Sequence, residues 1–145
     1  MEFQIIHERG DTSEVHAAIR RGIRTADPPD VGARDYVPLY LSLRDGAREI
    51  IGGLYGATMW KWLMIEGLWV AEHERRRGHG SRLLNAAETF AREHGCKGAS
   101  LGTFDFQARE FYERHGYRVV GELVDFPEGH RHFELAKRFT IEVGR

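Results

Sequence analysis

The chain has 145 residues, a formal net charge of -1 and a single cysteine. This length fits one domain with a sizeable core, and we expect residues 1–145 to form it. The near-neutral charge argues against nucleic-acid and membrane partners, and neither a transmembrane-length apolar run nor a secretory signal is recognisable. Because Cys96 has no partner for an internal disulfide, a reducing compartment is expected, and we predict a cytoplasmic protein.

The first part of the chain predicts one strand, one helix and a β-hairpin. Residues 2–8 have the pattern of a short strand. Thr12 or Ser13 can cap a helix whose apolar side chains recur at helical spacing from Val15 to Ala26, and the Asp-Pro-Pro-Asp sequence at 27–30 ends it. Residues 28–35 are expected to form a loop that can include a short helical turn. Val37 and the leucines at 39, 41 and 43 alternate with less apolar residues and predict a strand. The glycine-rich residues 48–58 are expected to form the strand that returns beside it.

The remaining elements predict a mixed sheet covered by helices. The nearly continuous apolar run at 62–72 is typical of a central strand. A helix over 80–94, a strand over 97–104 and a short helix over 107–116 follow, and strands at 117–124 and 130–138 close the chain. Since a helix joins the strands at 62–72 and 97–104, these two should be parallel in a right-handed crossover. The order β-α-β-β-β-α-β-α-β-β indicates an α/β fold with a mixed sheet.

The sequence HERRRGHGSRLL, at residues 73–84, concentrates positive charge between a strand and a helix. The first N–H groups of a helix have no internal partner and attract anions such as phosphate. Gly78 and Gly80 allow the backbone to come close to a ligand, and the three arginines at 75–77 add forked donors. The pattern therefore predicts a phosphate site, with a solvated basic loop as the alternative.

The loop differs from the common nucleotide-binding motifs. A P-loop has Lys-Ser or Lys-Thr after its second glycine, whereas this chain has Ser81-Arg82. The dinucleotide fingerprint has a third glycine, which is absent at residue 83. Mononucleotide and dinucleotide sites are therefore disfavoured.

Two motifs in the right order resemble those of the GNAT N-acetyltransferases. Arg75-x-x-Gly78-x-Gly80 is similar to the family's pyrophosphate loop, and the segment FYERHGY at 111–117 to its Phe/Leu-Tyr-x-x-x-Gly-Phe/Tyr helix ending. The motif-level resemblance covers roughly residues 60–138, and the N-terminal third matches only in architecture. The resemblance implies a GNAT-like fold with splayed parallel strands and an acetyl-CoA-dependent N-acetyltransferase.

The resemblance also implies how acetyl-CoA binds. The pyrophosphate would take the loop amides and arginines, and the pantetheine arm would pair with the first splayed strand near 68–70. A β-bulge at Glu66-Gly67 would re-aim backbone groups there. The residues expected at the cofactor are Leu68, Trp69, Val70, Arg75, Arg76, Arg77, Gly78, His79, Gly80, Ser81, Gln107 and Phe111.

In this family the acceptor amine attacks the thioester directly, in a ternary complex. Tyr112 occupies the position of the family's tyrosine, which implies a proton donor to the leaving thiolate. A backbone N–H at about Val70 would stabilise the oxyanion. Glu66 is the candidate base, because desolvation of a carboxylate in an apolar strand would raise its pKa, and a water chain is the alternative.

Asp105 departs from the family pattern, and His130 and His132 have no role in it. Asp105 stands where many members carry an asparagine, so a contact from this side chain to the cofactor is in doubt, and Gln107 is a substitute. His130-x-His132 places two imidazoles on one strand face. We expect no metal there, because no third ligand stands out and the chemistry needs none.

The acceptor is expected to be a primary amine of a small molecule, since the chain is short and has no appended recognition domain. A protein or peptide amine is one alternative, and a non-catalytic acyl-CoA-binding module is another. A nucleic-acid binder that uses the arginine loop is disfavoured by the neutral net charge. The resemblance also allows a homodimer.

Overall fold

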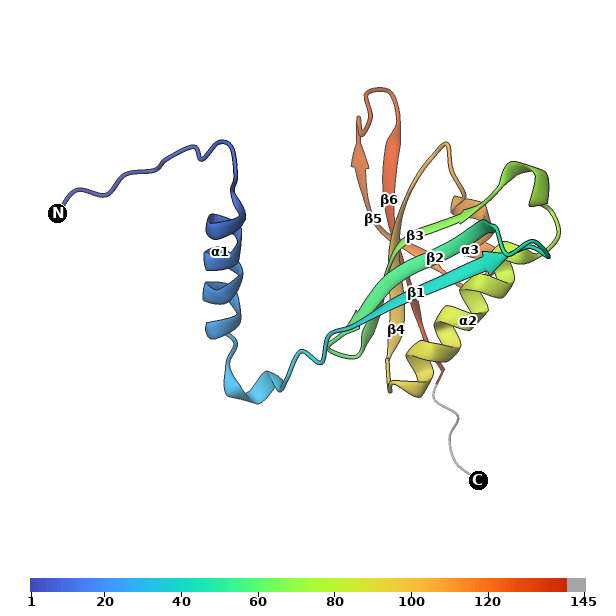
Figure 1. Ribbon diagram of the computed structural model, residues 1–145, viewed down its shortest axis with the longest axis horizontal. Helices are drawn as coiled ribbons and strands as arrows, with labels where there is room; N and C mark the ends of the chain where they lie inside the picture. The colour runs from blue at the N-terminus through green and yellow to red at the C-terminus, as the bar shows by residue number, and fades with distance from the viewer. Residues whose placement is uncertain (141–145) are drawn as a thin grey trace. The chain divides into compact units, whose positions relative to one another are not determined.

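The computed structural model describes residues 1–140, which divide into two compact units, residues 1–33 and a unit that begins at Arg34 (Figure 1). The first unit contains helix α1 (Ser13–Thr25) and a 3-10 turn η1 (Pro29–Val31), as the sequence predicts. Thr12 is the N-cap residue, but its side chain makes no capping hydrogen bond. The Asp11 carboxylate accepts the Ser13 N–H instead, at 3.0 Å.

The strand expected at residues 2–8 is not formed. A strand is stable only when its backbone groups pair with a neighbour, and an apolar pattern does not encode that neighbour. All six strands that the structure describes lie in one sheet, and residues 2–8 belong to none of its ladders. The order of elements therefore begins with a helix.

The second unit is built on a six-stranded mixed sheet in the order β1-β2-β3-β4-β6-β5. Only β3 and β4 are parallel, and the other neighbouring pairs are antiparallel, which confirms the predicted α/β class with a mixed sheet. The strands are β1 (Val37–Arg44), β2 (Ile50–Met59), β3 (Trp62–Val70), β4 (Gly98–Phe104), β5 (Arg118–Val124) and β6 (Arg131–Arg138).

Helix α2 (His79–Glu93) connects β3 to β4 and lies across β1, β2 and β3 (Figure 1). It follows a 3-10 turn, η2 (Glu72–Glu74), and the short helix α3 (Arg109–Arg114) follows β4. Leu63, Leu84 and Leu135 are fully buried between the sheet and α2. No helix within residues 1–140 is long and apolar enough to span a membrane.

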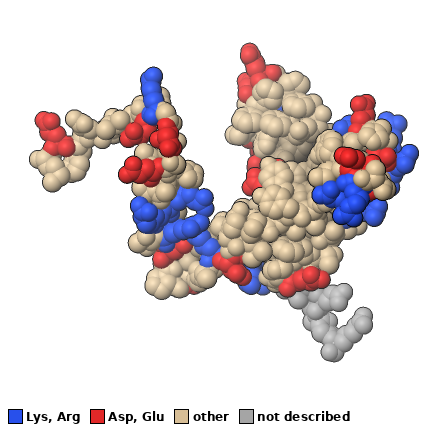
Figure 2. All heavy atoms as spheres, viewed as in Figure 1, with Lys and Arg blue, Asp and Glu red and all other residues tan. Residues whose placement is uncertain are grey.

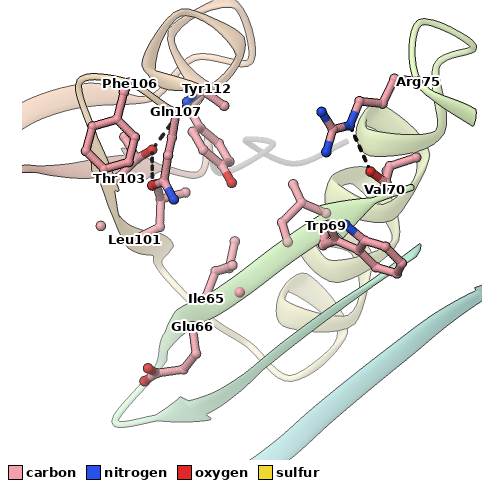
Figure 3. A pocket seen from close by; sticks show the side chains of 14 residues that line it. Ile65, Glu66, Trp69, Val70, Arg75, Leu101, Thr103, Phe106, Gln107 and Tyr112 are labelled. Atoms are coloured by element: carbon pink, nitrogen blue, oxygen red, sulfur yellow. Dashed lines mark hydrogen bonds between the residues drawn. The ribbon is translucent and has the colours of Figure 1, made fainter. Parts of the chain in front are cut away.

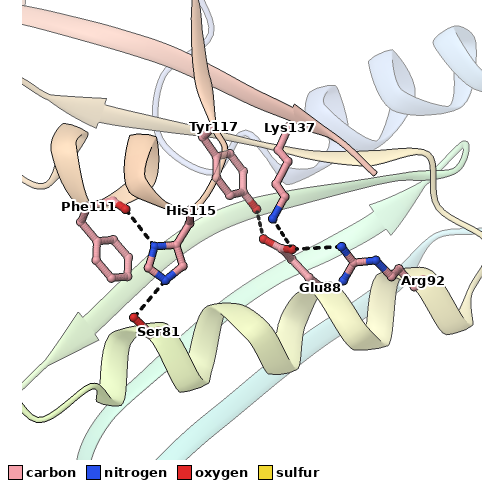
Figure 4. Close-up of polar contacts among 7 residues, drawn as sticks. All are labelled: Ser81, Glu88, Arg92, Phe111, His115, Tyr117 and Lys137. Atoms are coloured by element: carbon pink, nitrogen blue, oxygen red, sulfur yellow. Dashed lines mark hydrogen bonds and ion pairs between the residues drawn. The ribbon is translucent and has the colours of Figure 1, made fainter. Parts of the chain in front are cut away.

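A buried ion cluster fastens α2 to β6 (Figure 4). Glu88 of α2 is only 2% exposed, and its carboxylate accepts hydrogen bonds from Tyr117 Oη at 2.9 Å and Lys137 Nζ at 2.8 Å. Arg92 lies 3.4 Å away and completes the cluster. A buried carboxylate is tolerated only when its oxygens are paired in this way.

Candidate active site

Strands β3 and β4 separate halfway along their length and leave a pocket between them. Their parallel ladder runs from Trp62 paired with Gly98 to Ile65 paired with Leu101, and ends there although both strands continue. The pocket has a volume of about 580 Å³ and is lined by β3 residues 65–70, β4 residues 101–103, residues 106–108, Arg75 and Tyr112 (Figure 3). The splayed strands that the resemblance implies are therefore present.

A β-bulge on β3 lies at the start of this pocket, as expected. Tyr55 of β2 pairs with Gly67 and the next residue, Gly56, pairs with Ile65, so Glu66 has no partner on β2. A Cβ on Gly67 would lie 2.5 Å from the ring of Tyr55, so a larger residue at this position would require that ring to move. The extra residue bends the strand and re-aims the backbone that follows.

The second half of β3 presents one unpaired edge to the pocket. Residues 68–70 pair with residues 52–54 of β2 on one side, and on the other side the ladder to β4 has already ended. Arg75 Nε donates to the Val70 carbonyl at 2.9 Å, and this bond holds the guanidinium beside the pocket (Figure 3). Unpaired N–H and C=O groups at a sheet edge can receive an extended ligand as an added strand.

The loop between β3 and α2 is basic, but its arginines are not equivalent. Figure 2 shows the positive charge gathered around this loop, with acidic side chains among it. Arg77 is paired with Glu74 at 3.2 Å, and His79 lies 3.8 Å from the same carboxylate. Arg75 and Arg76 line a second hollow of about 950 Å³, against α3. These two arginines are therefore better placed for an anion than Arg77.

Gly78 and Gly80 meet different steric requirements at the start of α2. Gly78 is the N-cap residue and has a left-handed conformation with φ of 80°, which favours glycine. A Cβ on Gly80 would lie 3.3 Å from the ring of Phe111. Gly80 therefore allows α3 to pack on the first turn of α2, and Phe111 contributes to the site through this packing.

His115 ties the end of α3 to the same turn (Figure 4). Its Nδ1 lies 3.0 Å from the Phe111 carbonyl, so this nitrogen carries the proton in the neutral ring. Nε2 then accepts a hydrogen bond from Ser81 Oγ at 2.9 Å. The Ser81 hydroxyl, expected at the cofactor, is thus engaged by a histidine in this structure.

Tyr112, the proton donor that the sequence predicts, lines the pocket between the splayed strands. Its ring points into the space between the splayed strands, and the side chain is almost entirely buried (Figure 3). Burial raises the pKa of the phenol, because the phenolate would lose its hydration. Tyr112 is therefore neutral near pH 7 and holds a proton that it can donate.

Glu66 lines the pocket from the bulge but is exposed. The sequence argument for Glu66 as the base required a desolvated carboxylate, and this side chain is not desolvated. Because its carboxylate faces water, it needs no ion-pair partner. In Figure 3 its carboxylate points away from Tyr112. Glu66 lies on the β3 side of the pocket, at the opposite end from the phenol.

Gln107 and Asp105 are both engaged in holding the turn after β4. The Gln107 amide oxygen accepts from the Phe104 N–H at 3.0 Å, which leaves the amide nitrogen to face the pocket. Asp105 accepts hydrogen bonds from His130 Nδ1 at 2.9 Å and the Arg131 N–H at 3.0 Å. Desolvation opposes ionisation of Asp105, but these hydrogen bonds outweigh it and lower the pKa of the carboxyl.

His130 and His132 do not converge on one point. His130 contacts Asp105, whereas His132 Nδ1 lies 3.6 Å from Glu134 Oε1. Within residues 1–140, no three His, Cys, Asp or Glu side chains are grouped as metal ligands would be. The two imidazoles therefore have separate surroundings and can have separate roles.

Sequence reasoning missed the β4 side of the pocket. Gly102, Thr103 and Phe106 line it, and none was singled out. The exposed Gly102 between buried Leu101 and Thr103 follows strand alternation, which was the available signal. The contact of His132 with this glycine depends on the pairing of β4 with β6 and was not visible in the chain.

Comparisons with known proteins agree with this geometry. A family model described as the acetyltransferase (GNAT) family matches residues 12–117. A blasticidin-S acetyltransferase of Streptomyces morookaense is 45% identical over 93 residues, which are 63% of this chain and 68% of the relative. The crystal structure of an acetyltransferase from Bacillus cereus superposes with a TM-score of 0.80 at 32% identity, over 92% of this chain and 98% of the other.

A third match carries a ligand. A Bacillus anthracis protein assigned as a streptothricin acetyltransferase was solved in complex with acetyl coenzyme A. It is 25% identical, has a TM-score of 0.59, and is matched over 64% of this chain and 58% of its own.

Proposed function

Because this chain belongs to the acetyltransferase (GNAT) family, we propose that it moves an acetyl group from acetyl-CoA to the primary amine of a small molecule. The observation that carries the proposal is the pocket between β3 and β4, with an unpaired strand edge on one side and the neutral phenol of Tyr112 on the other. The family match extends across both structural units, which supports one acetyltransferase domain over residues 1–145.

Acetyl-CoA is proposed to enter from the loop between β3 and α2. The pyrophosphate binds Arg75, Arg76 and the N–H groups of residues 78–81, because a helix start and two guanidinium groups together compensate its charge. The pantetheine arm pairs with the free edge of β3 at residues 68–70. This places the thioester in the pocket that Tyr112 faces.

Acetyl transfer develops negative charge on the thioester oxygen and then on the departing thiolate, and residues near the pocket are proposed to stabilise each. The neutral amine attacks the thioester carbonyl, the backbone N–H at Val70 stabilises the oxyanion, and Tyr112 gives its proton to the departing thiolate. Tyr112 recovers a proton from the nitrogen of the new amide. The amine first loses a proton to Glu66 or to a water chain.

Two observations support a small-molecule acceptor: the short length of the chain and its similarity to a blasticidin-S acetyltransferase. The blasticidin-S acetyltransferase makes blasticidin S the first amine to test on this chain. A panel of small primary amines and a lysine peptide beside it separates a small-molecule acceptor from a protein one. We also propose a cytoplasmic location, since the single Cys96 fits a reducing compartment.

Calorimetric titration with acetyl-CoA, 3′-dephospho-CoA and ATP tests the binding step. Replacing Arg75 and Arg76 together with alanine should weaken acetyl-CoA binding about tenfold or more per arginine, since about 1.4 kcal/mol corresponds to a factor of ten. Arg118→Ala, an exposed arginine on β5, is the matched control and should bind as the wild type does. No binding at millimolar acetyl-CoA would refute the proposed cofactor site.

Release of the CoA thiol with each amine tests the transfer step. The protein's own Cys96 is buried, and burial raises the pKa of its thiol, so its background reaction is small. Tyr112→Phe should lower kcat by about 10²–10⁴-fold while the acetyl-CoA Kd stays unchanged. Unchanged turnover in this variant would remove Tyr112 from the mechanism, and binding without turnover in the wild type would favour a non-catalytic module.

A further inference from the structure

His132 and Glu134 lie on the sheet face opposite to α2, beside the pocket. Phe133 and Leu135 of β6 are buried in the core, so the alternate residues His132 and Glu134 point to the other face. In the β4–β6 ladder, Glu134 is paired with Gly102, which lines the pocket. The pair therefore lies beside the pocket on its β4 flank.

Gly102 allows the imidazole to approach the backbone of β4. A Cβ on Gly102 would lie 2.7 Å from both Cε1 and Nε2 of His132, and 3.1 Å from Glu134 Oε1. No larger residue could stand at 102 without displacing the ring. The His132 side chain is 17% exposed, and its ring packs against Gly102, which lines the pocket.

The two nitrogens of His132 have different surroundings. Nδ1 faces the carboxylate of Glu134, with Oε1 at 3.6 Å. Nε2, on the Gly102 side, has no hydrogen-bond partner within residues 1–140 and is left as the base. Two phenylalanines, Phe104 and Phe126, pack edge-on against the ring and hold its orientation.

Other charged groups near His132 are already neutralised in pairs. In the turns after β4 and before β6, Asp105 accepts a hydrogen bond from His130, which packs against Phe106. On β5, Glu122 is paired with Arg131 at 3.5 Å. Glu134 is therefore the carboxylate that faces His132.

We propose that His132, held by Glu134, is the general base that deprotonates the acceptor amine. The inference rests on the proposed acetyl transfer and gives the proton a destination other than Glu66. The ammonium N–H bond breaks and its proton passes to His132 Nε2, while the nitrogen keeps the electron pair. The neutral amine then forms the C–N bond, the C–S bond breaks, and the imidazolium returns its proton to solvent.

The test is the pH dependence of kcat/KM, measured by thiol release with blasticidin S or another amine that the wild type accepts. His132→Gln should lower kcat/KM by about 10²–10⁴-fold near pH 7, the range for general-base catalysis. The loss should shrink as the pH approaches the amine's own pKa, because the free amine then needs no base. Added imidazole should restore part of the rate, and Glu134→Gln should produce a smaller loss.

Three controls separate a chemical role from a structural one. The acetyl-CoA Kd should be unchanged in His132→Gln, since the proposed cofactor contacts lie on β3, on the loop that follows it and at the start of α2. His94→Gln, at the far end of α2, should leave kcat/KM and its pH profile unchanged. Glu66→Gln, measured in parallel, tests the competing assignment of the base to β3.

The outcomes also separate this inference from the proposed function. Wild-type activity with an unaltered rate and pH profile in His132→Gln would overturn the inference alone. A large loss in Glu66→Gln with none in His132→Gln would do the same and assign the base to β3. No thiol release by the wild type with any amine would overturn the proposed function and the inference with it.

Discussion

Replacing Glu88 with alanine should destabilise the protein severely, although Glu88 lies outside the pocket. The substitution removes the acceptor of the fully buried Tyr117 hydroxyl and the counter-ion of Lys137. Breaking a buried pair from one side costs about 3–5 kcal/mol. The Lys137 side chain is 24% exposed and can partly regain water, so the lower half of this range is expected.

Denaturant and thermal unfolding measure this effect. For a chain of this size, about 3–5 kcal/mol corresponds to a fall in Tm of about 6–20 °C. The denaturant midpoint should fall while the slope m stays constant. Glu93→Ala, an exposed glutamate of the same helix, is the control and should change stability by less than about 0.5 kcal/mol.

A second variant distinguishes a lost partner from lost packing. Converting the cluster to apolar residues together, as Glu88→Leu with Tyr117→Phe and Lys137→Met, removes all three polar groups at once. Such replacements are often neutral or stabilising, so the triple variant should be more stable than Glu88→Ala. A loss below about 1 kcal/mol in Glu88→Ala would refute the reasoning, because burial would then require no pairing.

Further predictions concern pH and the glycines. Burial raises the folded-state pKa values of Tyr112 and Tyr117, and Glu88 adds to the shift at Tyr117, so the native state keeps protons that the unfolded chain loses. The free energy of unfolding should therefore fall above about pH 10, by up to about 1.4 kcal/mol per pH unit for each tyrosine. Tyr117→Phe should reduce this slope. The lowered pKa of Asp105 gives stability that is present above its unfolded value and lost on acidification, so Asp105→Asn should flatten the acid limb of the stability profile. Gly56→Ala should cost about 1–3 kcal/mol in denaturant titration, because its Cβ would meet the backbone of β3. Gly67→Ala should cost less, because its Cβ would meet only a half-exposed tyrosine ring that can move.

The sequence predicted elements wherever local pattern and local capping agree. Helix α2 lies within one residue of its expected range, because its apolar stripe and Gly95 are both local signals. The strand expected at residues 2–8 is not formed, because the pattern of a strand does not specify which neighbouring strand will pair with it. The bulge at Glu66 was foreseen because an acid and a glycine interrupt an otherwise apolar strand.

The site was predictable in kind but not in detail. The motifs located Tyr112 and the arginine loop, and the pocket lies between them. The individual roles depend on long-range contacts. Ser81, for example, is held by a histidine 34 positions away. Such pairings follow from how α3 packs on α2, which no local pattern encodes.

The contact between Gly80 and Phe111 has a consequence for how the enzyme can be altered. This contact and the His115–Ser81 hydrogen bond both hold the first turn of α2 against α3. If acetyl-CoA binds at this turn as proposed, its affinity and the placement of the Tyr112 phenol cannot be changed independently at this end of α2. A bulkier residue at position 80 would push on Phe111 and so displace Tyr112, the proposed proton donor, without contacting it, and directed evolution of donor specificity should begin elsewhere.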